Sequence, residues 1–326
     1  MNYIVFDLEW NQCPYGKERE NPRLPFEIVE IGALKLNNEK ETLDEFHRLI
    51  HPTVYRKMHY RTKQILDMDM EQLEKGDYFG KAVKDFLQWC AADGDYRFCT
   101  WGGTDLVELQ RNMKYYGKLG LIEGPIPYYD VQKLFSLDFE DGKSRKSLEY
   151  GIDFLHIKKE RNFHHALDDA FYTAEILKRL DQDLVERRFS IDCYQNPKER
   201  KDQIRVVFDD YEKFISREFD SKEEAMKDKD VTQSRCFLCG KNVRKKIRWF
   251  SGNSKNYYCL AYCPVHGYLK GKARMKKTDE GGIYVVKTIK LIDETGAERI
   301  REKRKGLKVK RKQKKVHKKN EINREK

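Results

Sequence analysis

Apolar residues follow two different periods in the first half of the chain. Short apolar runs rich in β-branched or aromatic residues predict five strands, at 3–10, 27–35, 46–51, 97–101 and 128–131. Apolar residues at every third or fourth position predict four helical segments, at 78–91, 105–117, 147–151 and 166–180. Three strands followed by helix–strand alternation predict an α/β domain with a mixed sheet over residues 1–185.

The second half of the chain has a different pattern. Residues 186–235 are highly charged, and Phe208, Tyr211, Phe214 and Phe219 are spaced like one face of a helix, which predicts a partly helical connector. Residues 236–293 form a small cysteine-rich unit, and residues 294–326 form a basic tail. The run from Arg299 to Lys319 has almost no apolar content, so we expect this tail to be disordered.

Charge and cysteine content narrow the possible partners. The chain has 326 residues, of which 37% are charged, with a formal net charge of +12. This excess of basic residues favours binding to nucleic acid or to an anionic surface. No apolar run approaches the ~18 residues needed to cross a bilayer. The N-terminal segment carries carboxylates and lacks the pattern of a signal peptide, so we expect a cytoplasmic protein without a membrane partner. In the cytoplasm, the eight cysteines are expected to be thiols or metal ligands rather than disulfides.

Two separated segments carry candidate acidic residues. Asp7 and Glu9 in FDLEW alternate along a predicted strand, so both project from one face, where burial without a cation is costly. Asp105 in WGGTD follows a glycine-rich turn and opens a helix. Each has a purely structural alternative, namely an edge strand for Asp7 and Glu9, and a helix cap for Asp105 with Glu108.

The stretch FHHALDDA, residues 163–170, contains paired histidines and paired aspartates. Asp169 shares its helical stripe with Thr173, Ile176 and Leu180, which predicts an inward side chain. Asp168 shares its stripe with Tyr172, Glu175 and Arg179, which predicts a solvent face. A histidine can join Asp169 only from the loop before the helix, and this favours His164 over His165.

These three segments together resemble a known family. FDLEW, WGGTD and H-x-A-x-x-D, in this order and spacing, resemble the exonuclease motifs of the DEDDh family, the DnaQ-like 3′–5′ exonucleases with a ribonuclease H-like fold. PFEIVEIGALKL and FHRLIHP resemble strands of the branch that contains KapD and the Eri-type RNA exonucleases. The resemblance covers residues 1–180. The sequence departs from the family after the third strand, where it reads RTKQIL and many relatives carry a T-G-I-like segment that contacts the terminal nucleotide.

The resemblance implies a mechanism and site residues. It implies two Mg²⁺ or Mn²⁺ ions, with Asp7 bridging both, Glu9 and Asp169 on the ion that carries the attacking water, and Asp105 assisting through the second. His164 would take the proton of that water. The expected activity is 3′–5′ exonucleolytic hydrolysis of single-stranded nucleic acid to nucleoside 5′-monophosphates, with RNA, or RNA with a 3′ overhang, preferred. A DNA exonuclease for repair or proofreading and a non-catalytic nucleic-acid-binding protein are the alternatives.

The cysteine-rich unit has the spacing of a metal site. CFLCGK and CPVHG are two C-x-x-(C/H)-G knuckles, in which the glycine permits the turn that aims backbone amides at sulfur. They predict a zinc-ribbon-like unit with a closed structural Zn²⁺ site of Cys236, Cys239, Cys263 and His266. Cys259 is a rival fourth ligand, and unmetallated thiols are the other alternative.

Aromatic and basic residues alternate between and after the knuckles. The aromatic residues are Trp249, Phe250, Tyr257, Tyr258 and Tyr268, and the basic residues are Lys245, Lys246, Arg248, Lys270, Lys272 and Arg274. This combination suits stacking on single-stranded bases, although packing in a small core explains the aromatic residues equally well.

Overall fold

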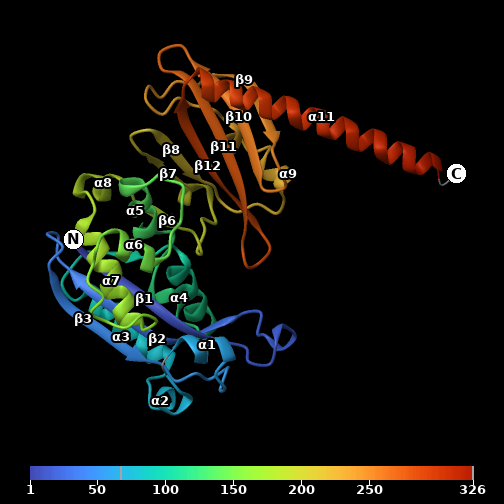
Figure 1. Cartoon of the computed structure of the whole chain (residues 1–326). Helices are drawn as coiled ribbons and strands as arrows, with labels where there is room; N and C mark the ends of the chain where they lie inside the picture. Colours follow the sequence, from blue (N-terminus) through green and yellow to red (C-terminus); the bar gives the residue numbers. More distant parts are fainter. Residues whose placement is uncertain (67, 325–326) are drawn as a thin grey trace. The chain divides into compact units, whose positions relative to one another are not determined.

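The structure is a computed structural model that describes residues 1–66 and 68–324, with side chains through Lys310 and at Gln313. The chain forms two compact units, Met1–Gln195 and Asn196–Lys326 (Figure 1). No helix within the described residues is long and apolar enough to cross a membrane.

A six-stranded mixed sheet forms the centre of the first unit, in the order β3-β2-β1-β4-β5-β6. Its strands are β1 (Asn2–Gln12), β2 (Phe26–Leu36), β3 (Thr42–Leu49), β4 (Tyr96–Thr100), β5 (Ile126–Asp130) and β6 (Ser190–Asp192). Strand β1 is central, antiparallel to β2 and parallel to β4. The predicted fold class and all five predicted strands are confirmed, and β6 is an additional strand that the apolar pattern does not predict.

Helices cover both faces of this sheet. Helices α3 and α4 pack on the face of β1 that carries Ile4, Phe6 and Leu8, and α5, α6 and α7 pack on the face that carries Tyr3 and Val5. Burial on both faces explains the continuous apolar runs at residues 3–6 of β1 and 31–34 of β2. The helices of this unit are α1 (Tyr60–Ile65), α2 (Met70–Glu74), α3 (Phe79–Ala91), α4 (Thr104–Tyr115), α5 (Val131–Phe139), α6 (Leu148–Phe154), α7 (Ala166–Arg179) and α8 (Gln182–Arg187).

The second unit contains a six-stranded antiparallel sheet in the order β7-β8-β12-β11-β10-β9. Its strands are β7 (Ile204–Val207), β8 (Tyr211–Ile215), β9 (Arg244–Ser251), β10 (Asn256–Cys263), β11 (Gly267–Lys277) and β12 (Ile283–Ile292). Its helices are α9 (Lys222–Ala225), α10 (Lys229–Thr232) and α11 (Glu294–Arg324). The unit is therefore larger than the zinc ribbon expected at residues 236–293.

The connector expected at residues 186–235 supplies two strands of this sheet. The helical face predicted through Phe208, Tyr211 and Phe214 is wrong, because β7 and β8 form a hairpin around Asp209 and Asp210. The amide of Phe208 donates to the carbonyl of Tyr211 at 2.8 Å and closes the turn. Two apolar runs around an Asp-Asp pair fit a two-residue hairpin as well as a helix face, and pairing with β12 selects the hairpin.

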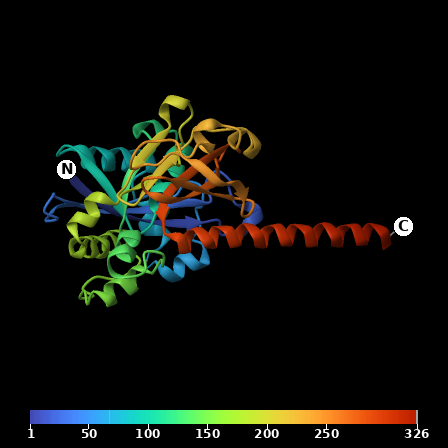
Figure 2. The same cartoon turned by 90° about the horizontal axis from the view of Figure 1, so that it is seen from above.

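The expected disorder of the basic tail is also contradicted, because residues 294–324 form α11. Ala297 and Ile300 anchor its first turns against Ile247 and Leu260 of the sheet. Arg301 pairs with Glu294 and Glu298 at 2.7 and 2.8 Å. Lys, Arg and Glu are good helix formers, so the anchored helix continues beyond the sheet of its own unit (Figures 1 and 2). Residues 325–326 of the predicted tail lie outside the described residues.

Candidate active site and metal centre

Asp7 and Glu9 lie on the central strand β1, which excludes the edge-strand alternative for this pair. They continue the row of Tyr3 and Val5, on the face of the sheet that α7 covers. Both side chains are partly buried. The strand therefore presents two carboxylates to the first turn of a helix.

Gly32 allows that helix to come close. Gly32 of β2 lies opposite Asp7 in the sheet register. A Cβ atom at Gly32 would lie 2.0 Å from the amide nitrogen of Leu167 and 2.2 Å from the carbonyl carbon of Ala166. Only glycine permits this approach, which carries the start of α7 to the two carboxylates of β1.

The start of α7 supplies Asp169 and His164. Ligand atoms of Glu9, His164 and Asp169 all lie within 4.8 Å of one another. His164 precedes the helix with φ of 67°, a left-handed conformation that is uncommon for a residue with a side chain and that accumulates at functional sites. Its backbone amide donates to the Asp169 carboxylate. His165 is the N-cap residue of α7 and lies outside this three-residue group.

Asp105 reaches the same carboxylates from α4. It is buried in the first turn of the helix, and the N-cap residue is Gly103, so Asp105 is not the cap. The backbone amide of Leu8 donates to its carboxylate, which connects Asp105 to β1 between Asp7 and Glu9. Asp7, Glu9, Asp105 and Asp169 thus come from three elements to one place.

The four carboxylates oppose one another's ionisation. Burial, and after it the charges of Asp105, Glu9 and Asp169, raise the pKa of Asp7 well above its usual range. Burial together with Asp169, Glu30 and Asp105 raises the pKa of Glu9 to about 8. Burial also raises the pKa of Asp105 to about 7 and that of Asp169 to about 6, the latter against the lowering effect of His164. Four clustered acids whose charged forms are disfavoured are what a multivalent cation stabilises.

Glu30 is a buried carboxylate beside the site that the motif analysis misses. It lies opposite Glu9 on β2, with 2% of its side chain exposed. Its Oε1 lies 2.7 Å from Nε2 of His47, and its Oε2 accepts from the amide of Ala166, the first residue of α7, at 3.2 Å. A Glu inside the otherwise apolar, buried stretch IVEIGAL, residues 28–34, is the sequence signal for it.

Replacing Glu30 by alanine is expected to reduce catalytic turnover about 10–100-fold, the usual effect of losing a group that orients a metal ligand. The reason is that the first amide of α7 loses its acceptor, so Asp169 and His164 lose their fixed position. Glu30→Gln keeps an acceptor oxygen and should retain more activity. Turnover measured beside the melting temperature checks this, and unchanged turnover in a folded Glu30→Ala protein contradicts it.

The two faces predicted for α7 are only partly correct. Thr173, Ile176 and Leu180, which share the stripe of Asp169, are buried as expected. Tyr172, expected on the solvent face with Asp168, is fully buried, because its hydroxyl donates to the carbonyl of Arg161 at 2.7 Å. Asp168 pairs with the Arg161 side chain at 3.5 Å and is not part of the acidic cluster.

Cys236, Cys239, Cys263 and His266 come together in the second unit. Their ligand atoms all lie within 4.8 Å of one another. The Sγ atoms of Cys239 and Cys263 are 3.7 Å apart, and Nδ1 of His266 lies 3.5 Å from Sγ of Cys236. A tetrahedral Zn²⁺ site with Zn–S bonds of about 2.3 Å places sulfurs about 3.8 Å apart, so the four donors fit zinc.

Both knuckles have the geometry expected from their glycines. Gly240 and Gly267 have φ of 69° and 85°. The amides of Leu238 and Cys239 donate to the sulfur of Cys236. Burial raises the pKa of the Cys263 thiol, but hydrogen bonds from the amides of His266 and Val265 outweigh it and lower the pKa to about 6. This favours the thiolate, which is the form that binds metal.

Cys259, the rival ligand, lies outside this cluster. It is fully buried in β10, and its Sγ lies 3.8 Å from the hydroxyl of Ser234. Burial raises its pKa to about 11, which disfavours the thiolate. The structure therefore assembles His266, and not Cys259, with the three other cysteines.

Comparisons with known proteins address the family of the first unit. A family model described as Exonuclease (RNase T) matches residues 4–177. No curated protein sequence matches the chain.

Three solved structures illustrate the structural likeness. The nuclease domain of 3′hExo, a DEDDh family member, bound to rAMP, is 20% identical with a TM-score of 0.48, covering 58% of this chain and 96% of that chain. S. pombe Pop2p, in its Mg²⁺- and Mn²⁺-bound form, is 16% identical with a TM-score of 0.41, covering 54% and 81%. E. coli ExoI, in a complex with single-stranded DNA, is 12% identical with a TM-score of 0.43, covering 57% and 42%.

The family model settles the enzyme class. It spans more than half of the chain, including both β1 and α7 of the candidate site. The chain therefore belongs to the exonuclease family, and it is an exonuclease, as its resemblance to the DEDDh enzymes predicts.

Proposed function

We propose that this exonuclease removes nucleotides from the 3′ end of single-stranded nucleic acid, with RNA preferred, and releases nucleoside 5′-monophosphates. The observation that carries the proposal is the convergence of Asp7, Glu9, Asp105 and Asp169 with His164 at the start of α7. These are the five residues of the DEDDh pattern; the four carboxylates lie on β1, α4 and α7, and His164 lies in the loop before α7.

The acidic cluster fits two divalent cations. Carboxylate oxygens are the ligands that Mg²⁺ and Mn²⁺ prefer. Oδ1 of Asp169 is buried and has no hydrogen-bond partner among the described residues, as expected for an atom that ligates a metal. We assign Asp7 to both ions, Glu9 and Asp169 to one, and Asp105 to the other. Bound there, the ions would supply a nucleophilic water and stabilise charge on the attacking and leaving oxygens.

His164 is assigned as the general base. It is exposed at the mouth of the cluster, and its position is fixed by the contact between its own amide and Asp169. Histidine is the side chain that most often accepts the proton of an attacking water. The left-handed backbone at His164 turns the chain so that its side chain joins Glu9 and Asp169.

Replacing His164 by asparagine is expected to lower the turnover number about 10²–10⁴-fold, which is the usual contribution of a general base. Asparagine tolerates the left-handed backbone, so the fold and the acidic cluster should remain. His165→Asn is the matched control, and its turnover should stay near that of the wild type. Loss of activity in His165→Asn with activity retained in His164→Asn would reverse the assignment.

The proposed preference for RNA rests on the resemblance of the β2 and β3 sequences to KapD and the Eri-type RNA exonucleases. The net charge of +12 does not discriminate, because it suits any polynucleotide. The test is a competition between 5′-labelled RNA and DNA oligonucleotides of the same sequence, with Mg²⁺ and then Mn²⁺. We expect the RNA to shorten first and the released products to be nucleoside 5′-monophosphates. Faster loss of the DNA would assign the enzyme to DNA maintenance.

We also propose that the second unit holds one structural Zn²⁺ through Cys236, Cys239, Cys263 and His266. The support is the tetrahedral spacing of the four donors and the amides that face two of the sulfurs. Four protein ligands leave no open position for a substrate, so this site is structural.

A further inference from the structure

The second unit has a basic cavity outside both sites already described. It has a volume of about 880 Å³ and is lined around the edge strand β9 by residues from β9, β10, α10 and α11 and by Met226, which follows α9. The lining residues are Met226, Thr232, Arg244, Lys245, Lys246, Arg248, Trp249, Tyr257 and Arg304. Five of these nine are cations and none is acidic, so the cavity suits an anion.

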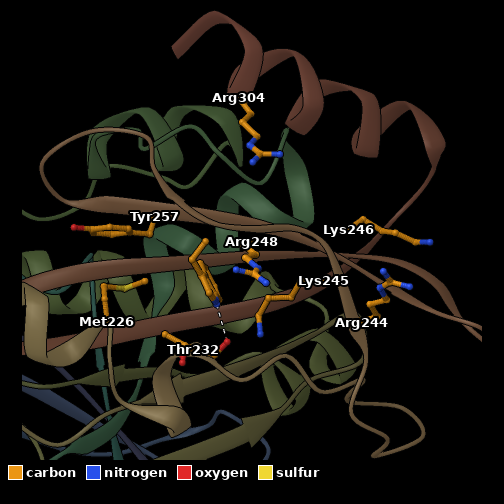
Figure 3. A pocket seen from close by; sticks show the side chains of 9 residues that line it. Met226, Thr232, Arg244, Lys245, Lys246, Arg248, Tyr257 and Arg304 are labelled. Atoms are coloured by element: carbon orange, nitrogen blue, oxygen red, sulfur yellow. Dashed lines mark hydrogen bonds between the residues drawn. The ribbon is translucent and has the colours of Figure 1, made fainter. Parts of the chain in front are cut away.

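No acidic side chain among the described residues pairs with the cations of the cavity. Among the described residues, none of the five forms an ion pair, although neighbouring Arg and Lys residues of the same unit commonly do. In Figure 3, Arg248 and Lys245 lie centrally, Arg244 and Lys246 lie to one side, and Arg304 reaches down from α11. Unpaired guanidinium groups gathered from two elements are available to bind phosphates.

Two aromatic side chains line the same cavity and are held in place. Nε1 of Trp249 donates to the carbonyl of Thr232 at 2.8 Å, and the Trp249 ring fills the space left by Gly271, where a Cβ would lie 2.8 Å from it. Tyr257 is half-buried beside it in the same apolar cluster, at the opposite side of the cavity from Arg244 (Figure 3). A ring that is already fixed loses little entropy when a planar group stacks on it.

We propose that this cavity binds a segment of single-stranded nucleic acid, with its phosphates on Arg244, Arg248 and Arg304 and a base against Tyr257. A cationic wall combined with ring faces that line the same cavity is how single strands are bound without base-specific contacts. An acidic peptide would use the cations but leave the rings unused. The inference rests on the proposed function in one respect, namely that the polyanion this protein meets is a polynucleotide.

The test uses the full-length chain with Asp7→Asn in every protein, so that a fluorescent 20-nucleotide single-stranded RNA stays intact. The triple variant Arg244→Gln, Arg248→Gln, Arg304→Gln should raise the Kd about 10²-fold and reduce the slope of log Kd against log salt by about 2, since each lost phosphate contact removes about 0.7. The matched control Lys227→Gln, Lys241→Gln, Lys277→Gln removes three exposed charges that do not line the cavity, and should change the Kd less than threefold.

Tyr257→Leu tests the stacking step and keeps apolar volume in the cluster. We expect about a tenfold weaker Kd for RNA, no change for heparin, which is anionic but has no bases, and recovery in Tyr257→Phe. Equal losses in the triple variant and its control, no loss in either, an unchanged Kd for RNA in Tyr257→Leu, or tighter binding of poly-glutamate than of RNA would each overturn the proposal.

A separate readout distinguishes failure of this inference from failure of the exonuclease mechanism. With Asp7 intact, the triple variant should hydrolyse the 4-nitrophenyl ester of a nucleoside 5′-monophosphate at the wild-type rate, because this small substrate needs only the acidic site. If no protein hydrolyses the ester, the catalytic proposal fails. If all hydrolyse it and RNA binding is also unchanged, the cavity proposal fails alone.

Discussion

Replacing Asp7 by asparagine is expected to reduce exonuclease activity at least about 10²–10³-fold and to raise the melting temperature of the metal-free protein. The activity falls because Asp7 is the carboxylate assigned to both ions, and losing one group that stabilises transition-state charge commonly costs this much. Stability rises because burial, and after it the charges of Asp105, Glu9 and Asp169, disfavour the ionised form of Asp7. Activity at saturating Mg²⁺ and thermal unfolding in chelator are the two measurements.

Asp168→Asn is the matched control for this prediction. Asp168 is in the same first turn of α7 as Asp169, but it pairs with Arg161 and lies outside the acidic cluster. Its activity should remain within a few-fold of the wild type. Loss of activity in Asp168→Asn, or a stability decrease in Asp7→Asn, would contradict the assignment of an ion-holding cluster at Asp7.

Replacing Cys263 by alanine is expected to remove zinc and to lower the melting temperature of the second unit by at least about 10 °C. Structural zinc supplies about 10–16 kcal/mol in small zinc-binding peptides, and each kcal/mol corresponds to several °C in a domain of this size. Cys263 is buried with Cys236, Ala261, Leu269 and Ile289, so losing the metal also loosens this cluster. Zinc content by mass spectrometry and thermal unfolding are measured together.

The control for the zinc prediction is Cys259→Ala. Cys259 is equally buried in the same strand but lies outside the four-donor cluster. We expect one zinc per chain in this variant and none in Cys263→Ala. Retention of zinc in His266→Ala together with its loss in Cys259→Ala would make Cys259 the fourth ligand.

Much of the first unit could be predicted because its elements are set by local pattern. Apolar residues on both faces predict β1 and β2, and the stripe of Asp169, Thr173 and Ile176 predicts the inward aspartate from the sequence alone. Tyr172 was harder, because a tyrosine on a polar stripe can bury its ring and bond through its hydroxyl. Helical periodicity therefore assigns the buried face correctly for purely apolar or purely polar side chains, but not for an amphipathic side chain such as tyrosine.

Other features depend on pairing between distant segments, which no local pattern contains. The β7–β8 hairpin is selected by its pairing with β12, about 70 residues further along the chain. Helix α11 is anchored where Ala297 and Ile300 contact the sheet, and the highly charged sequence around them does not reveal those two contacts. Gly32 and Glu30 are visible in the sequence, but their roles follow only from the approach of α7 to β2.

The central claim is that the four carboxylates and His164 form a metal-dependent 3′–5′ exonuclease site. The most direct measurement is a time course on 5′-labelled single-stranded RNA with Mg²⁺, comparing wild type, Asp7→Asn and Asp168→Asn. The account predicts a ladder that shortens from the 3′ end in the wild type and in Asp168→Asn, and intact RNA in Asp7→Asn. The same ladder in a folded Asp7→Asn protein, or in the wild type with divalent metal removed, would contradict it.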